Sequence, residues 1–140
     1  METVMPDISI RSRSHTELID ITPQISSLMP RGMDSGICNL FSMHTTAGLT
    51  INENADPDVK KDIVFLLDKI APWTNSMYQH GEGNSAAHVK ASLMGLSLAI
   101  PVRNGRLHLG TWQCVYFCEF DGPRDRTVCV EFTGTASHGK

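Results

Sequence analysis

Several features that would assign the chain to a specialised class of protein are missing from its 140 residues. No apolar run approaches 18 residues and the N-terminus carries no apolar segment, so we expect neither a membrane-spanning helix nor a secretory signal. Positive charge is not in excess, because 12 Lys and Arg stand against 15 Asp and Glu. A net charge of −3 provides no electrostatic surface for nucleic acid or for a membrane, and we expect neither partner.

Cysteine is scarce, and its spacing lacks the C-x-x-C pattern of metal and redox motifs. The four cysteines all fall in segments that we expect to be strands: Cys38, Cys114, Cys118 and Cys129. There they behave as small apolar core residues. This pattern predicts reduced thiols and a cytoplasmic protein that is not secreted.

The length fits one domain spanning residues 1–140, which can bury a core without disulfides or a metal. It is too short for a TIM barrel or for a two-domain dinucleotide-binding protein. The sequence has no internal repeats and no interior linker. Residues 1–6 and 134–140 are expected to be flexible.

Periodicity predicts a mixed arrangement of strands and helices. Three helices are expected, over residues 23–29, 57–70 and 84–94. Alternating or apolar segments predict strands, with residues 8–13 and 17–21 paired as a hairpin and Asn104-Gly105 as a two-residue turn. The other strands are expected over residues 36–43, 49–53, 96–102, 106–109, 111–120 and 126–132. The predicted fold class is α+β, a compact single-domain β-sandwich-like sheet with two or three helices.

The segment 43–54 departs from the composition of a hydrophobic core. His44 ends an apolar strand and is followed by Thr45 and Thr46, and Glu53 and Asn54 come at the end of the next strand. A strand-end histidine is often only a structural residue. The density of polar side chains here instead favours a site, since such groups contribute little to a core.

His44, His80 and His88 are candidates for a joint site. Three imidazoles and an open position are the ligand set of a catalytic zinc-type metal. His80 and His88 are eight residues apart and not on one helix face, so both can equally be exposed polar residues at a loop–helix junction. The spacing leaves these two alternatives open.

A second group follows the long predicted strand, at Asp121, Arg124 and Arg126. Asp-Gly-Pro is ordinary turn chemistry, and arginines beside such a turn are often only solvated. Two guanidinium groups at one loop can also bind a phosphate through paired hydrogen bonds. Both interpretations are kept.

Six ordered motifs resemble the YjbQ family, whose members are often labelled secondary thiamine-phosphate synthases. The motifs span most of the chain: His44–Ala47, Ile51–Pro57, His80–Asn84, Ala87-His88, Leu109–Gln113 and Asp121–Arg124. The resemblance implies a compact α+β fold that forms a homotrimer. It also implies a site around His44, His80 and His88, with a bound divalent metal ion and with Glu53, Asn54 and Asn84 nearby.

Two functions of different classes follow. The first is an enzyme acting on a small phosphorylated metabolite, with weak thiamine-phosphate synthase activity implied by the resemblance. There Glu53 and His44 are catalytic, Glu53 being the base, and Arg124 orients the phosphate. The remaining predicted contacts to substrate come from Thr45, Thr46, Asn54 and Asn84. The alternative is a non-catalytic trimeric module that binds a metal or an anion.

Overall fold

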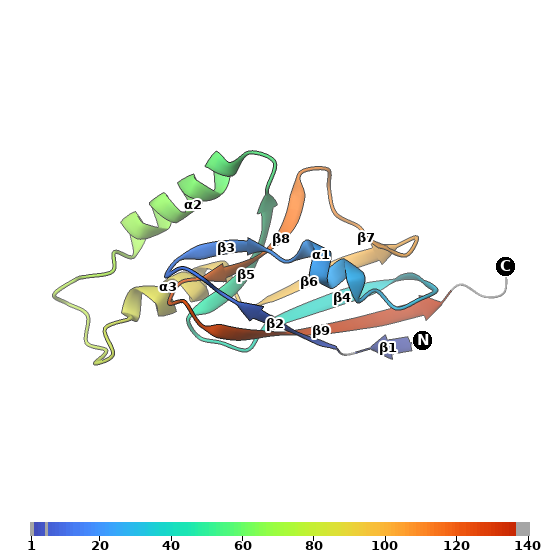
Figure 1. The fold of residues 1–140 in the computed structure, drawn as a ribbon, viewed down its shortest axis with the longest axis horizontal. Helices are drawn as coiled ribbons and strands as arrows, with labels where there is room; N and C mark the ends of the chain where they lie inside the picture. The colour runs from blue at the N-terminus through green and yellow to red at the C-terminus, as the bar shows by residue number, and fades with distance from the viewer. Residues whose placement is uncertain (1, 5, 137–140) are drawn as a thin grey trace.

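The computed structural model describes residues 2–4 and 6–136 of the chain. These residues form three helices and nine strands (Figure 1). The elements of the N-terminal half are β1 (Glu2–Val4), β2 (Asp7–Arg11), β3 (Glu17–Asp20), α1 (Thr22–Ser27), β4 (Met33–Ser42), β5 (Ala47–Glu53) and α2 (Pro57–Ile70). Those of the C-terminal half are α3 (Ser85–Met94), β6 (Ser97–Arg103), β7 (Arg106–Leu107), β8 (Gln113–Glu119) and β9 (Asp125–Ala136).

The strands form two antiparallel sheets. The large sheet has the order β1-β9-β4-β6-β7, and β2 pairs with β9 on the same side as β1. The small sheet has the order β3-β8-β5. Alternation of the side chains gives β4 of the large sheet one buried face, with Cys38 and Leu40, and one outer face, with Ile37 and Phe41.

The main hydrophobic core lies between the two sheets. Its large-sheet members include Leu40, Ile100 and Phe132, and its small-sheet members include Leu49 and Phe117. Helix α1 closes one end of this space with the fully buried Ile25. The arrangement is the sandwich-like α+β fold that the sequence predicts.

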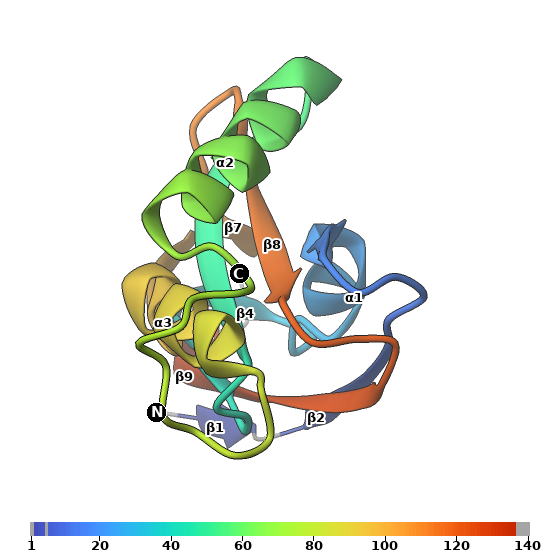
Figure 2. The ribbon, with the colours of Figure 1, turned by 90° about the vertical axis from the view of Figure 1, so that its left-hand side faces the viewer.

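Helices α2 and α3 form a third layer over the other face of the small sheet, as the end-on view shows (Figure 2). Leu67 of α2 and Ala87 and Ala91 of α3 pack in one cluster with Tyr116 and Phe120. Both faces of β8 are therefore covered within a single chain, by the main core and by these helices.

Local sequence signals place the boundaries of α2. The Asp56 side chain accepts a hydrogen bond from the Asp58 amide, and Pro57 begins the helix. The Asn104-Gly105 turn joins β6 to β7 with positive φ at both residues, as a two-residue hairpin requires. None of the described helices combines the length and apolar character needed to cross a membrane.

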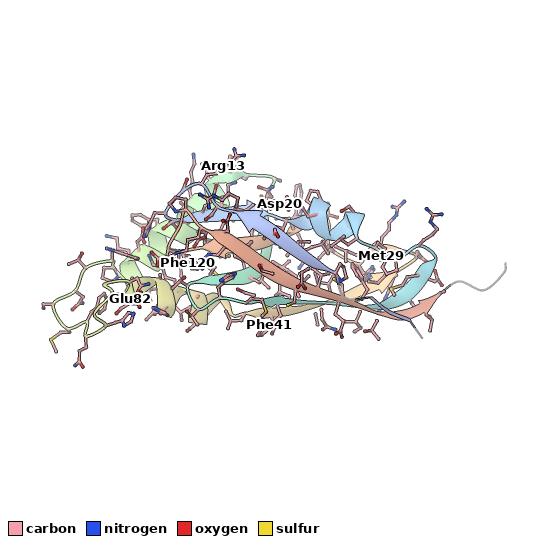
Figure 3. All side chains as sticks on the ribbon, turned by 60° about the horizontal axis from the view of Figure 1, so that its bottom comes forward. Arg13, Asp20, Met29, Phe41, Glu82 and Phe120 are labelled. Carbon is pink, nitrogen blue, oxygen red and sulfur yellow. The ribbon has the colours of Figure 1, made fainter. Side chains whose placement is uncertain are left out.

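One structural prediction is wrong. Strands β2 and β3 do not form a hairpin with each other, because β2 pairs with β9 in the large sheet and β3 with β8 in the small one. Within the ends that were expected to be flexible, Glu2 lies opposite Gly134 and Ala136 lies opposite Met33, and the flexibility of these ends stays a prediction. Met1, Met5 and residues 137–140 lie outside the described residues. Figure 3 shows the side chains on this frame, with Phe41 on the outer face of the large sheet and Phe120 toward the interior.

Candidate functional site

A polar cavity of about 390 Å³ lies where the loops at one end of the two sheets meet the start of α3. The β4–β5 loop contributes His44, Thr45 and Thr46, and the loop before α3 contributes His80 and Glu82. Further lining residues are Met43, Asn84, His88, Asp121, Arg124 and Arg126. The structure therefore brings seven of the nine predicted site residues to one cavity.

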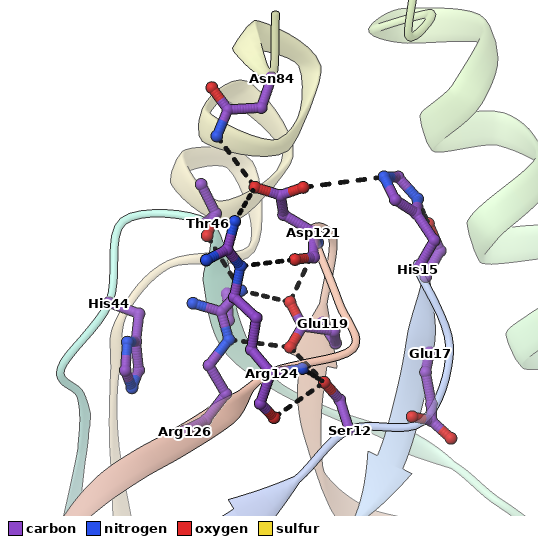
Figure 4. Close-up of polar contacts among 12 residues, drawn as sticks. Ser12, His15, Glu17, His44, Thr46, Asn84, Glu119, Asp121, Arg124 and Arg126 are labelled. Carbon is purple, nitrogen blue, oxygen red and sulfur yellow. Dashed lines mark hydrogen bonds and ion pairs between the residues drawn. The ribbon is translucent and has the colours of Figure 1, made fainter. Parts of the chain in front are cut away.

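The wall of the cavity contains an ion pair between Arg126 at the start of β9 and Glu119 at the end of β8 (Figure 4). Glu119 is fully buried and Arg126 is only 5% exposed. Arg126 Nε donates to Glu119 Oε1 at 2.8 Å, and its Nη2 contacts both Glu119 Oε2 and Thr46 Oγ1. The pair joins the large sheet to the small sheet and holds the guanidinium group in one orientation.

Ser12 completes the environment of the buried carboxylate. Its Oγ donates to Glu119 Oε1 at 2.7 Å, and the Asp121 amide donates to Glu119 Oε2 at 3.0 Å. Burial alone would raise the pKa of Glu119, but the hydrogen bonds from Arg126, Ser12 and the Asp121 amide outweigh it and hold the pKa below its ordinary value. Glu119 is therefore a charged structural partner of Arg126 at neutral pH.

Arg124 is held at the rim of the cavity by the loop between β8 and β9. Its Nε donates to the Asp121 carbonyl at 2.8 Å and its Nη2 to Asp121 Oδ2 at 3.1 Å. Gly122 permits this loop to lie against the chain before β3, because a Cβ there would come within 2.3 Å of the Ser14 carbonyl oxygen. The predicted Asp-Gly-Pro turn thus holds Arg124 in place, although its side chain is still half exposed.

Asn84 immediately precedes α3 and is 8% exposed. Its Nδ2 donates to Asp121 Oδ2 at 2.9 Å, the same oxygen that Arg124 contacts. Within the described part of the chain, Asn84 Oδ1 is buried and has no hydrogen-bond partner. Asp121 therefore links Asn84 at the start of α3 to Arg124 in the β8–β9 loop.

His44 is a neutral residue with a defined tautomer. Its Nε2 accepts a hydrogen bond from the Thr127 amide at 2.8 Å, so the ring proton lies on Nδ1. Burial lowers the pKa of His44, the positive charge of Arg126 lowers it further, and Glu119 only partly offsets both. In this arrangement His44 is a hydrogen-bond donor, and its lone pair is already in use.

His80 and His88 contact each other with their rings perpendicular and the ring centroids 5.2 Å apart. Among residues 2–4 and 6–136, no three His, Cys, Asp or Glu side chains form a group that could hold a metal ion. The physical reason at His44 is that a metal ligand needs a free nitrogen lone pair, and Thr127 occupies that of Nε2. The three histidines share a cavity but do not fit the predicted three-histidine metal centre.

Glu53 and Asn54 lie away from the cavity. In β5, Ala47 pairs with Glu119, whereas Glu53 pairs with Gln113. Glu53 is therefore six residues further along the strand than Ala47, which corresponds to about 20 Å at ordinary strand rise. Asn54 instead contacts Asp20 and accepts a hydrogen bond from the Tyr116 hydroxyl. Within a single chain Glu53 does not line this cavity, and its role as a base stays a prediction.

Three residues near the cavity were missed as parts of the site. The roles of Ser12 and Glu119 could not be predicted from local sequence. Ser12 contacts Glu119, which is more than 100 residues away, and Glu119 contacts Arg126 in the other sheet. His15 is exposed in the bend between β2 and β3. Its ring packs edge-on against Trp73 at 4.4 Å, and its Nε2 lies 3.9 Å from Asp121 Oδ1.

These features define a two-sheet α+β protein with a polar cavity of histidines and arginines at one end. The family model described as UPF0047 protein YjbQ-like matches residues 6–135, and the chain belongs to this family. It is 48% identical over 132 residues to UPF0047 protein YugU of Bacillus subtilis, covering 94% of this chain and 100% of YugU. To UPF0047 protein YjbQ of Salmonella typhimurium it is 41% identical over 111 residues, covering 75% and 78% of the two chains.

Solved structures show the same fold. A YjbQ/UPF0047 protein of Clostridium acetobutylicum, described as uncharacterized, matches with a TM-score of 0.88 and 50% identity over 91% of this chain and 99% of its own. A protein of Sulfolobus solfataricus, described as being of unknown function, matches with a TM-score of 0.90 and 33% identity over 96% and 99%. These descriptions contain no reaction, and the thiamine-phosphate synthase activity implied by the resemblance finds no support in them.

Proposed function

We propose that this protein is an enzyme that binds a small phosphorylated metabolite in the cavity between the β4–β5 loop and the β8–β9 loop. The observation that carries the proposal is the pair of arginines, Arg124 and Arg126, held by carboxylates in one cavity with three histidines. Each guanidinium group uses Nε and Nη2 for protein contacts, and within the described residues neither Nη1 has a protein partner. Fixed guanidinium donors of this kind suit the oxygen atoms of a phosphate.

The histidines are the groups through which the chain can transfer protons. His44 presents a proton on Nδ1 and can donate a hydrogen bond to a charge that develops on the substrate. His80 and His88 line the same cavity and contact each other, and either imidazole can act as a general base or acid. This assignment replaces Glu53, which the strand carries away from the cavity.

The family resemblance gives one specific candidate reaction, a weak thiamine-phosphate synthase activity. That reaction joins a pyrimidine diphosphate to a thiazole phosphate, and both substrates are anions that two arginines could hold. A non-catalytic module that binds an anion is the alternative function. The two oriented guanidinium groups favour this alternative, because they can bind an anion without any chemical step.

The proposal is tested first by binding. We expect isothermal titration calorimetry to detect phosphate esters, and Arg124→Lys to weaken their binding by about 1–3 kcal/mol, because Lys loses the fork of donors that Asp121 orients. Arg106→Lys, an exposed arginine on β7, is the matched control and should leave binding unchanged. Equal affinity in wild type and Arg124→Lys would remove Arg124 from the site.

Activity separates the enzyme from the binding module. The protein is incubated with a panel of phosphorylated metabolites that includes the two thiamine-phosphate precursors, with and without a chelator. If wild type forms a product and the His80→Ala and His88→Ala variants do not, the result supports the enzyme function. Binding of phosphate esters without any product across the panel favours the module.

We propose separately that a divalent metal ion, if the protein takes one up, depends on His80 and His88 and not on His44. Support comes from the contact between those two rings and from the Thr127 amide that engages His44. After zinc loading and dialysis, elemental analysis of His44→Ala should give the zinc content of wild type, whereas His80→Ala should lose it. Loss of zinc in His44→Ala would restore the three-histidine centre.

We also propose that the protein works in the cytoplasm as a homotrimer. The reducing location is supported by four cysteines that are all free, of which Cys38, Cys114 and Cys118 are buried. The trimer is implied by the family resemblance and supported by exposed Ile37 and Phe41 on the outer face of β4. Apolar side chains gathered on one sheet face favour contact with another chain.

A further inference from the structure

A second cavity, of about 510 Å³, has no part in the proposed function. It lies where α2, the loop after α2 and α3 meet the bend between β2 and β3. We call it the Trp73 cavity, and its lining residues are His15, Thr16, Asp68, Pro72, Trp73 and Lys90. It is next to the polar cavity, because the His15 ring that lines it also lies 3.9 Å from Asp121 Oδ1 (Figure 4).

The aromatic wall of the Trp73 cavity is held in place by several contacts. The ring of His15 packs edge-on against Trp73 at 4.4 Å, and His15 Nδ1 lies 3.1 Å from Thr16 Oγ1. The carbonyl of Pro72 accepts a hydrogen bond from the Tyr78 hydroxyl at 2.6 Å, which anchors the loop that carries Trp73. Trp73 is nevertheless 39% exposed. A fixed and partly open indole ring suits a flat aromatic ligand.

Opposite in character is the ion pair between Asp68 of α2 and Lys90 of α3, which also lines the Trp73 cavity. Lys90 Nζ donates a hydrogen bond to Asp68 Oδ1. The Lys90 side chain is only 4% exposed, whereas that of Asp68 is 56% exposed. In the part of the chain that the structure describes, Asp68 Oδ2 receives no hydrogen bond. A ligand in the cavity can therefore reach this carboxylate from solvent.

The charges of this pair decide which ligand fits. Lys90 already compensates the negative charge of Asp68, so a cationic ligand gains little from the carboxylate. An anionic ligand would be repelled by the carboxylate, which is the exposed member of the pair. A neutral N–H or O–H group can still donate a hydrogen bond to the ionised oxygen, and such a bond is stronger than one between neutral groups.

We infer that the Trp73 cavity binds a neutral aromatic molecule, which packs against Trp73 and donates an N–H or O–H hydrogen bond to Asp68. Lys90 is a positioning residue that holds the carboxylate and does not touch the ligand. This site goes beyond the proposed function, because neither Arg124 nor Arg126 lines it. The two sites can be tested independently.

Nuclear magnetic resonance titration of the full chain tests the inference with matched pairs of ligands. Indole is compared with 1-methylindole, and phenol with anisole, because the second member of each pair lacks the donor. The chain has two tryptophans, so the signal of the Trp73 indole N–H should move while that of Trp112 stays in place. We expect wild type to bind at least one donor-bearing ligand about tenfold more tightly than its methylated partner, as one hydrogen bond to a charged group implies.

A double variant removes the acceptor without leaving a buried charge unpaired. In Asp68→Leu with Lys90→Met, apolar side chains replace both members of the pair, a change that proteins often tolerate. The preference for the donor-bearing ligand should then fall to about one. Asp58→Leu with Lys61→Met is the matched control on α2, because it removes an exposed ion pair outside the cavity, and it should retain the preference.

Trp73→Ala leaves the ion pair intact and should weaken the binding of both members of each pair, so it serves if the double variant fails to fold. Unchanged affinity in Trp73→Ala overturns the inference, as does a donor preference that persists in the double variant. Equal binding of both members of each pair by wild type overturns it too. A titration in which the Trp73 signal does not move has the same meaning, and none of these outcomes bears on phosphate binding at Arg124 and Arg126.

Discussion

Glu119 shows how one buried side chain sets the geometry of the cavity. It receives Arg126, Ser12 and the Asp121 amide, which come from three different segments of the chain. Because a carboxylate accepts several hydrogen bonds and carries the compensating charge, it allows Arg126 to remain buried and charged. Removing it would leave the guanidinium group without a counterion.

We predict that Glu119→Gln destabilises the protein by about 3–5 kcal/mol at pH 7, the usual cost of breaking a buried ion pair on one side. The pKa of Glu119 is lowered by folding, so its contribution is fully present above about pH 4.5 and is lost as the pH falls through the folded-state pKa. Urea denaturation of wild type and variant should therefore converge as the pH is lowered. Glu82→Gln, whose side chain is mostly exposed, is the control and should change little; a constant difference down to pH 2 would refute the assignment.

The cysteines give a second prediction for single residues. Burial raises the pKa of Cys38 and of Cys118 to about 12, so neither thiol should ionise or react readily in the folded protein. Cys129 is partly exposed and should react first with a thiol reagent at pH 8. Protein denatured without reductant should titrate as four free thiols, and two or fewer would show that a disulfide forms.

At the scale of elements, a pair of glycines controls how closely β4 and β9 approach. Gly36 and Gly134 lie opposite each other in the antiparallel register. A Cβ on Gly36 would come within 2.3 Å of the Thr133 carbonyl oxygen, and one on Gly134 within 2.2 Å of that of Ser35. No side chain fits at either place unless the strands separate.

Gly36→Ala should therefore destabilise the protein by about 1–3 kcal/mol, since the added methyl group forces the backbones of β4 and β9 apart. Gly81→Ala is the matched control, because a Cβ there meets nothing within 4 Å and its φ is not positive. Thermal unfolding followed by circular dichroism measures both. Similar melting temperatures for Gly36→Ala and wild type would contradict the close approach.

The elements themselves were largely predictable from local patterns. Periodicity, the Asp56-Pro57 start and the Asn104-Gly105 turn located α2 and the β6–β7 hairpin because each signal acts within a few residues. Strand pairing was not predictable in the same way. The short polar segment at Ser14 and His15 looked like a hairpin turn, yet there the chain crosses from the large sheet to the small one.

The candidate site was predictable only where its residues lie in loops at one end of the sheets. His44, Asn84 and Arg124 could be grouped from their motifs. The distance of Glu53 from the cavity could not be read from the sequence, because the nine residues between it and His44 include the extended strand β5. The role of Glu119 could not be predicted from the sequence, because it depends on the contact with Arg126 in the other sheet.

At the scale of the whole molecule, the outer face of the large sheet is the surface that would carry the proposed contact between chains. Phe41 and Ile37 project from it on β4, and Met43 follows at its end. A sheet face with several exposed large apolar side chains is unusual for an isolated chain. The small sheet offers no such face, because α2 and α3 cover it.

We predict that light scattering gives a trimer mass for wild type at micromolar concentration, and a monomer mass for Phe41→Glu. A charge at this position opposes burial against another chain. Phe65→Glu, at an exposed position of α2, is the control and should leave the mass unchanged. A wild-type monomer would contradict the trimer, and a Phe41→Glu trimer would move the interface elsewhere.

Strand β9 has a consequence for the order of events during synthesis on the ribosome. It pairs with β1 and β2 on one side and with β4 on the other, so it occupies the middle of the large sheet. A nascent chain that has emerged only as far as residue 124 has β2 and β4 but not the strand that joins them. Its apolar inner faces then stay exposed until β9 leaves the exit tunnel, so we expect the large sheet to close only after β9 has emerged, with slow closure over about 100 residues.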